Sequence, residues 1–117
     1  MKEKRSKENS IEYAFIKEIT SLFPSQIVKI IFFGSRAKEI FKPSSDYDFL
    51  IVLKDKRNKI IDEIYDVVTN FLIKHGVDIS LKIYREEDFK RMASIPTPFM
   101  NSILKTGKEL WTQKPKN

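Results

Sequence analysis

The sequence contains no cysteine, only one histidine, and no long uninterrupted hydrophobic run. Without cysteine the chain can form neither a disulfide framework nor a thiolate metal site. No apolar stretch approaches the roughly 18 residues that a membrane-spanning helix needs. The charged residues 1–10 are not followed by the apolar core of a signal peptide. We therefore predict a soluble, cytoplasmic protein that does not associate with membranes.

Composition indicates one small domain with a basic surface. Hydrophobic residues make up 41% of the 117 residues and charged residues 32%, which is enough apolar material for one core and too much for a disordered chain. The formal net charge is +6, from 22 Lys and Arg against 16 Asp and Glu. Such a charge suits attraction to nucleotides or nucleic acid. It is equally typical of a lysine-rich solvated surface, so it does not by itself predict nucleic-acid binding.

The spacing of apolar residues predicts alternating helices and strands. Helical spacing covers residues 10–23 and a long segment ending near His75, and shorter helices are expected at 36–41, 86–92 and 99–105. Apolar runs predict strands at 27–33, 47–53 and 77–83, the last with one polar face. The order α-β-α-β-α-β-α predicts one α/β (α+β) domain with a small sheet. We expect it to span residues 9–112, with a disordered tail at 1–8 and a second tail at 113–117.

Two aspartates, Asp46 and Asp48, open the second predicted strand. Their i, i+2 spacing directs both side chains to the same face of the sheet. Like charges at that separation raise one pKa or recruit a cation, and hard oxygen ligands suit Mg²⁺. A plain turn before a strand, Ser-Ser-Asp, is the alternative interpretation.

Gly34 and Ser35 follow the first predicted strand. Glycine lets a phosphate approach the backbone where a strand gives way to a helix, and Ser35 and Arg36 add a hydroxyl donor and a permanent cation. A strand-ending turn would explain the same residues. Asp78 lies in the third predicted strand and reaches the face of Asp46 and Asp48 if that strand lies beside the second. It would then act as general base or shared metal ligand; otherwise it is a solvated charge.

The ordered combination resembles the DNA polymerase β-type nucleotidyltransferase superfamily, and within it the minimal nucleotidyltransferase (MNT) proteins. Gly-Ser-Arg-Ala at 34–37, Ser-Asp-Tyr-Asp-Phe-Leu-Ile-Val at 45–52 and Val-Asp-Ile-Ser-Leu at 77–81 carry the resemblance, which extends from about Glu12 to Trp111. It implies the nucleotidyltransferase fold, a mixed sheet with helices mainly on one face and the active site at the Gly-Ser end. No position of the family's motifs is missing.

The resemblance also implies roles for individual residues. Gly34 and Ser35 would hold the nucleotide phosphates, with Arg36 and Ser45 beside them. Asp46, Asp48 and Asp78 would be the catalytic carboxylates and would bind Mg²⁺, one ion or two, with Mn²⁺ as a substitute. An acceptor hydroxyl would attack the α-phosphorus of a nucleoside triphosphate in line, and pyrophosphate would leave.

The small size leaves no room for an acceptor-binding domain, so we expect the acceptor on a partner. MNT proteins are commonly paired with a helical HEPN toxin, and the resemblance implies an antitoxin that transfers AMP from ATP to a tyrosine of that toxin. Two alternatives remain: a weakly catalytic or non-catalytic antitoxin that occludes a HEPN partner, and a transferase acting on a small molecule or an RNA end. The sequence does not specify the base, the acceptor or the oligomeric state.

Overall fold

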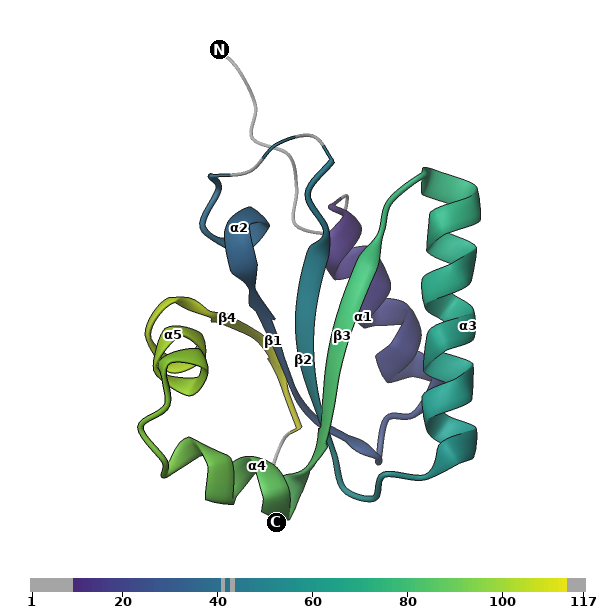
Figure 1. Cartoon of the computed structure of the whole chain (residues 1–117). Helices are drawn as coiled ribbons and strands as arrows, with labels where there is room; N and C mark the ends of the chain where they lie inside the picture. Colours follow the sequence, from purple (N-terminus) through teal and green to yellow (C-terminus); the bar gives the residue numbers. More distant parts are fainter. Residues whose placement is uncertain (1–9, 41, 43, 114–117) are drawn as a thin grey trace.

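The structure is a computed structural model of the whole chain, and it describes residues 10–40, 42 and 44–113. The elements in chain order are α1 (Ile11–Leu22), β1 (Ile27–Phe33), α2 (Gly34–Ala37), β2 (Tyr47–Leu53), α3 (Asn58–His75), β3 (Ile79–Arg85), α4 (Glu86–Ala93), α5 (Pro98–Thr106) and β4 (Lys108–Thr112). They form one sheet with helices on both of its faces (Figure 1). The predicted α/β class with a small mixed sheet is confirmed.

The four strands lie in the order β3-β2-β1-β4. β1 is antiparallel to both of its neighbours, whereas β2 and β3 run parallel. β3 lies at an edge of the sheet, which agrees with the one polar face predicted for this strand. β4 is a fourth strand beyond the three that the apolar runs predict. Pairing of Trp111 with Ile30 supplies backbone partners to the second side of β1, which a buried strand requires.

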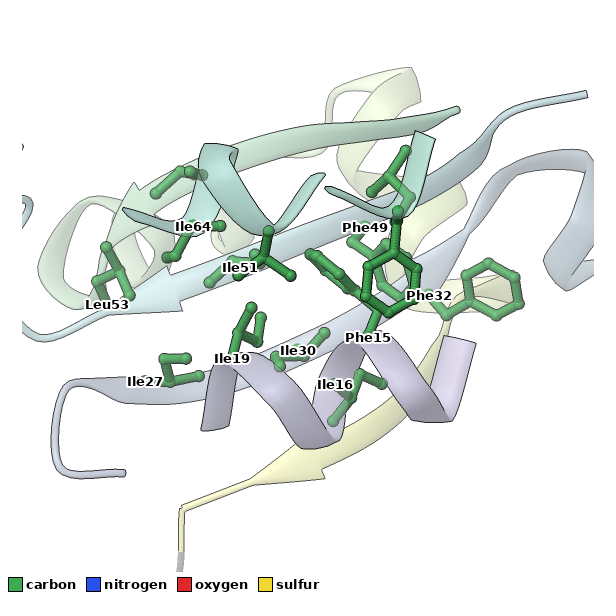
Figure 2. Close-up of a cluster of buried hydrophobic side chains, with 14 of the residues drawn as sticks. Phe15, Ile16, Ile19, Ile27, Ile30, Phe32, Phe49, Ile51, Leu53 and Ile64 are labelled. Atoms are coloured by element: carbon green, nitrogen blue, oxygen red, sulfur yellow. The ribbon is translucent and has the colours of Figure 1, made fainter. Parts of the chain in front are cut away.

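The larger core lies between the sheet and the two longest helices, α1 and α3. Phe15 of α1 packs against Phe49 of β2 with tilted rings and 5.0 Å between ring centroids, and Phe49 stacks against Phe32 of β1 at 5.1 Å (Figure 2). Aliphatic side chains fill the space around these rings, among them Ile19, Ile51 and Ile64. Burying such groups is the main favourable contribution to folding.

A second, thinner layer lies on the opposite face. Phe89 of α4 and Met100 and Ile103 of α5 cover Leu50 and Val52 of β2. The sequence predicts helices mainly on one face, and the two long helices do lie together there; α4 and α5 add this second layer. α5 begins at Pro98, one residue before the predicted helix at 99–105. Proline is well suited to the first position of a helix, and Thr97 caps this helix by accepting the Met100 N–H.

Local signals set several boundaries as expected. Ser10 caps α1 by accepting the Tyr13 N–H at 3.3 Å, and Gly76 ends α3 in the left-handed conformation, with φ of 68°. α2 is a single turn, shorter than the predicted helix at 36–41. β3 begins and ends two residues later than predicted. The predicted tail at 1–8 lies outside the described residues, and the domain limits stay a prediction.

No helix among the described residues is both long and apolar enough to cross a membrane.

Candidate active site

Three strand ends meet at one end of the sheet. β1 runs antiparallel to β2, and β2 runs parallel to β3, so the end of β1 lies beside the starts of the other two strands. α2 and the connection to β2 lie at this same end (Figure 1). Gly34 therefore follows β1 here, Asp46 and Asp48 open β2, and Asp78 directly precedes β3. The fold brings together the segments that the sequence singled out.

Strand register decides which face the carboxylates occupy. Asp48 alternates with the buried Phe49, so its side chain points to the same face as Leu50, which is the face that carries α4 and α5. Asp48 is paired with Phe33 of β1 and with Ser80 of β3. Extending the β2–β3 register by one residue from the Tyr47–Ile79 pair sets Asp46 opposite Asp78. Asp46 and Asp78 are both exposed, so the face is open to a ligand.

Gly34 lies directly against the Asp48 carboxylate. Its φ of 82° is in the left-handed region that favours glycine, and a Cβ atom built on it would collide with Oδ2 of Asp48. The strand-to-helix turn therefore depends on glycine for two separate reasons. Because residue 34 has no side chain, the backbone at the start of α2 lies close to the Asp48 carboxylate. This is the backbone segment that the sequence predicts to bind a phosphate.

Burial and charge perturb Asp48. Partial burial is the main reason that its pKa is raised above the ordinary value of 3.8, and the negative charge of Asp46 raises it further. The ammonium of Lys82 acts in the opposite direction and lowers this pKa. Asp46 and Asp48 are therefore close enough to repel each other, as their spacing predicted. A cation that binds between the two carboxylates removes this repulsion.

The third predicted carboxylate is placed differently. Across the part of the chain that the structure describes, no three His, Cys, Asp or Glu side chains converge closely enough to hold a metal ion. The structure thus brings Asp46 and Asp48 together and sets Asp78 beside them only through the strand register. The triad remains a prediction.

Ser45 and Arg36 lie on the connection that leads into β2. The Ser45 hydroxyl accepts the Lys42 N–H at 3.1 Å and closes a turn. The guanidinium of Arg36 donates from Nε to the Ser45 carbonyl at 2.7 Å and from Nη1 to the Tyr47 hydroxyl at 3.1 Å. These contacts fix the orientation of the Ser45 hydroxyl and of the Arg36 guanidinium. The nucleotide-binding role of both residues stays a prediction.

Two residues on the carboxylate face were missed by sequence reasoning. Ser80 is the register partner of Asp48, and Lys82 lies one step further along the same face of β3. The sequence does contain a signal for them: Ser80 and Lys82 lie two and four residues after Asp78, so all three side chains point to the same face of the strand. Without knowing that β3 pairs in parallel with β2, however, these residues read only as the solvated side of an edge strand.

Comparison with known proteins identifies the class. The family model described as "Polymerase beta, Nucleotidyltransferase" matches residues 15–116, a range that includes every candidate site residue. A protein of Methanocaldococcus jannaschii named "Putative protein adenylyltransferase MJ0604" is 33% identical over 97 residues, covering 83% of this chain and 91% of that one. The chain belongs to the polymerase β-type nucleotidyltransferase family and is a nucleotidyltransferase.

Solved structures show the same fold. A chain in the "Crystal structure of the toxin-antitoxin with AMP-PNP" matches with a TM-score of 0.58 and 18% identity, over 85% of this chain and 72% of that chain. The "Crystal structure of a putative nucleotidyltransferase from Sulfolobus solfataricus at 1.40 A resolution" matches with a TM-score of 0.52 and 24% identity, over 86% of this chain and 76% of that chain. At these identities the likeness establishes the arrangement of strands and helices.

Proposed function

We propose that this protein transfers AMP from ATP to a hydroxyl group of a partner protein, a tyrosine of a HEPN toxin, and that it acts as the antitoxin. The relative with 33% identity is named as a protein adenylyltransferase, and a fold neighbour comes from a toxin–antitoxin structure with the ATP analogue AMP-PNP. One observation of this structure carries the proposal: Gly34 lies against Asp48, whose carboxylate is paired with that of Asp46 on an open face of the sheet.

The residues present fit a divalent cation. Asp46 and Asp48 offer hard oxygen ligands on one face. Burial and, after it, the negative charge of Asp46 raise the pKa of Asp48, and a bound cation would offset both effects. Both carboxylates would hold Mg²⁺, with Asp78 as a third ligand, and Mn²⁺ accepts the same oxygen donors. When bound, the metal neutralises phosphate charge and lowers the pKa of the acceptor hydroxyl.

The remaining residues divide the work of binding and proton transfer. The backbone at Gly34 can approach the triphosphate without steric hindrance, and the Ser35 hydroxyl is a donor for its oxygens. We infer that Asp78, which lies opposite Asp46 when the β2–β3 register is extended by one residue, accepts the proton of the attacking hydroxyl. The hydroxyl oxygen forms a bond to the α-phosphorus, the bond to the bridging oxygen breaks, and pyrophosphate leaves with that bond's electron pair.

The test is nucleotide transfer with α-labelled ATP, Mg²⁺ and the protein encoded by the neighbouring gene. Wild type should place the label on that protein, on a tyrosine. The double variant Asp46→Asn and Asp48→Asn should lose about 100-fold or more of the rate, because the developing phosphate charge is no longer neutralised. A matched control, Asp62→Asn with Asp66→Asn, removes the same charge from exposed positions on α3 and should leave the rate unchanged.

The location of the label distinguishes this proposal from its alternatives. Tight complex formation without label would favour an antitoxin that acts by occlusion. Label found only on RNA ends or on a small alcohol would favour a different acceptor class. Undiminished transfer by the double variant would overturn the assignment of Asp46 and Asp48.

A further inference from the structure

Arg36 joins α2 to the residues on either side of Asp46. Its Nε donates to the carbonyl oxygen of Ser45 at 2.7 Å, and its Nη1 donates to the hydroxyl of Tyr47 at 3.1 Å. The guanidinium carbon also lies 4.3 Å from the centroid of the Tyr47 ring. One arginine thus holds the residue before Asp46 through its backbone and the residue after it through its side chain.

Tyr47 provides a fixed anchor for this contact. Alternation along β2 directs the Tyr47 ring to the face opposite Asp48, where it stacks on the buried Phe32 with 6.1 Å between centroids and 16° between ring planes. The Tyr47 N–H donates to the Asp78 carbonyl at 2.9 Å. The same residue is therefore tied to the core, to Arg36 and to the segment that carries the third candidate carboxylate.

The direction of the guanidinium argues against a direct role on the triphosphate. The Arg36 side chain reaches the Tyr47 ring, and that ring lies on the α1 and α3 side of the sheet, away from the face of Asp46 and Asp48. A planar guanidinium can stack on a ring while two of its N–H groups donate in fixed directions. A lysine ammonium is a point charge and does not reproduce that geometry.

We propose that Arg36 and Tyr47 form a clamp that sets the position of Asp46, so that Arg36 is a positioning residue for transfer and does not bind the triphosphate. The proposal rests on the proposed function for its catalytic consequence. The clamp holds the Ser45 backbone before Asp46 and the Tyr47 side chain after it. A misplacement of about 1 Å in a catalytic group is enough to lower a rate about 100-fold.

Kinetics of conservative variants separate positioning from phosphate binding. Arg36→Lys keeps the positive charge but loses the planar guanidinium and its two fixed N–H donors. Tyr47→Phe keeps the ring but loses the hydroxyl. We expect each to lower kcat by about 10-fold or more with the KM for ATP within about twofold. The double variant should lose little more than the worse single one, because both changes break one unit. A KM for ATP raised about 10-fold in Arg36→Lys, with kcat unchanged, would overturn the proposal.

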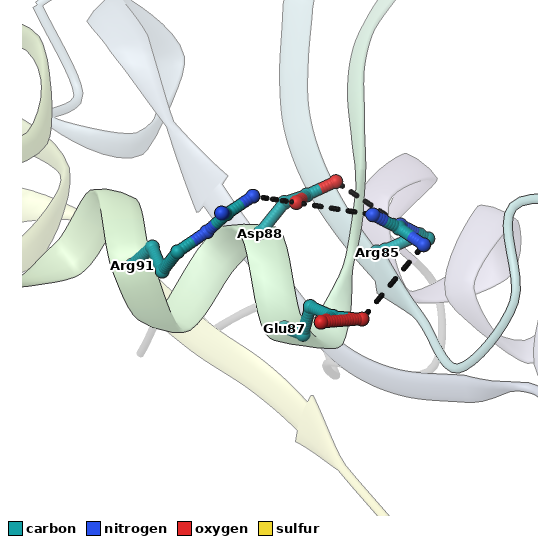
Figure 3. Close-up of polar contacts among 4 residues, drawn as sticks. All are labelled: Arg85, Glu87, Asp88 and Arg91. Atoms are coloured by element: carbon teal, nitrogen blue, oxygen red, sulfur yellow. Dashed lines mark hydrogen bonds and ion pairs between the residues drawn. The ribbon is translucent and has the colours of Figure 1, made fainter.

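The matched control is Arg85→Lys, the same chemical change at the other end of β3. Arg85 is paired there with Asp88 at 3.1 Å and with Glu87 at 3.8 Å, in a surface cluster that also contains Arg91 (Figure 3). This variant should leave kcat and KM unchanged, since the cluster is exposed and lies at the opposite end of β3 from Asp78.

A second measurement does not depend on activity. Amide hydrogen exchange of Ser45 and Tyr47, whose N–H groups bond to Lys42 and Asp78, reports directly on the clamped segment. In Arg36→Lys we expect both amides to exchange about 10-fold faster, while amides of β1 do not change. Unchanged exchange at both residues would overturn the clamp. If wild type transfers no AMP at all, the proposed function fails, and the exchange data still decide the clamp.

Discussion

At Asp48 the charged carboxylate that the proposed metal site requires lowers the stability of the folded chain. Its partly buried carboxylate lies beside Asp46, and both effects raise its pKa above 3.8. A group whose pKa is raised in the folded state binds protons more tightly there than in the unfolded chain. The free energy of unfolding is therefore highest below pH 3.8 with respect to this group, and it falls as the pH rises through the raised pKa.

Replacement of Asp48 by asparagine tests this argument. At pH 7 without divalent cations, Asp48→Asn should have a higher Tm than wild type, because the repulsion with Asp46 is gone. Addition of Mg²⁺ should raise the Tm of wild type and have little effect on the variant, since only wild type retains both ligands. Thermal unfolding between pH 4 and 8, with and without Mg²⁺, measures both effects. A variant less stable than wild type in EDTA at pH 7 would contradict the argument.

Gly34 and Gly76 form a natural pair for comparison. Both have positive φ, but a Cβ at Gly34 would meet the Asp48 carboxylate, whereas nothing lies within 4 Å of one at Gly76. Gly34→Ala should destabilise the protein by about 2–4 kcal/mol, from the left-handed backbone and the collision together. Gly76→Ala should cost about 1 kcal/mol, from the backbone alone. Urea unfolding of the two variants measures the difference, and equal losses would show that Gly34 does not depend on Asp48.

At the scale of elements, β2 connects the core to the site. Its central residues are apolar on both faces, with Phe49 under α1 and α3 and Leu50 under α4 and α5. The continuous apolar run at residues 47–53 predicted this strand, and the structure shows that its central residues are buried on both faces of the sheet. The position of α5 was not readable from its own sequence, because a short amphipathic helix fits either face of a sheet.

Alanine substitutions at neighbouring positions of β2 test both layers. Phe49→Ala should destabilise the protein by about 3–5 kcal/mol and Leu50→Ala by about 2–5 kcal/mol, since both side chains are fully buried. Denaturant unfolding gives both values. Ser80→Ala, a smaller change on the Leu50 side at the open end of the sheet, serves as the control and should cost about 1 kcal/mol or less. A loss below about 1 kcal/mol for Leu50→Ala would mean that α4 and α5 do not form a true core layer.

At the scale of the whole molecule, most of the described residues belong to one sheet and the helices that cover it. Several apolar side chains stay on the surface, among them Ile40, Ile73 and Leu104. Met100 and Ile103 are core, and Phe99 lies at the surface against Phe33 with perpendicular rings.

The sequence by itself determined the fold class and the two central strands, and its motifs at residues 34–37, 45–52 and 77–81 carry the resemblance to the family. The fold class and the strands follow from local spacing, because the period of apolar residues and the chemistry of a turn are properties of adjacent residues. Only the tertiary structure decided that Lys82 and Ser80 share the face of Asp48, that β4 completes the sheet, and that Arg36 is directed to Tyr47. Each of these depends on strand order and register, which arise from contacts between residues far apart in the chain.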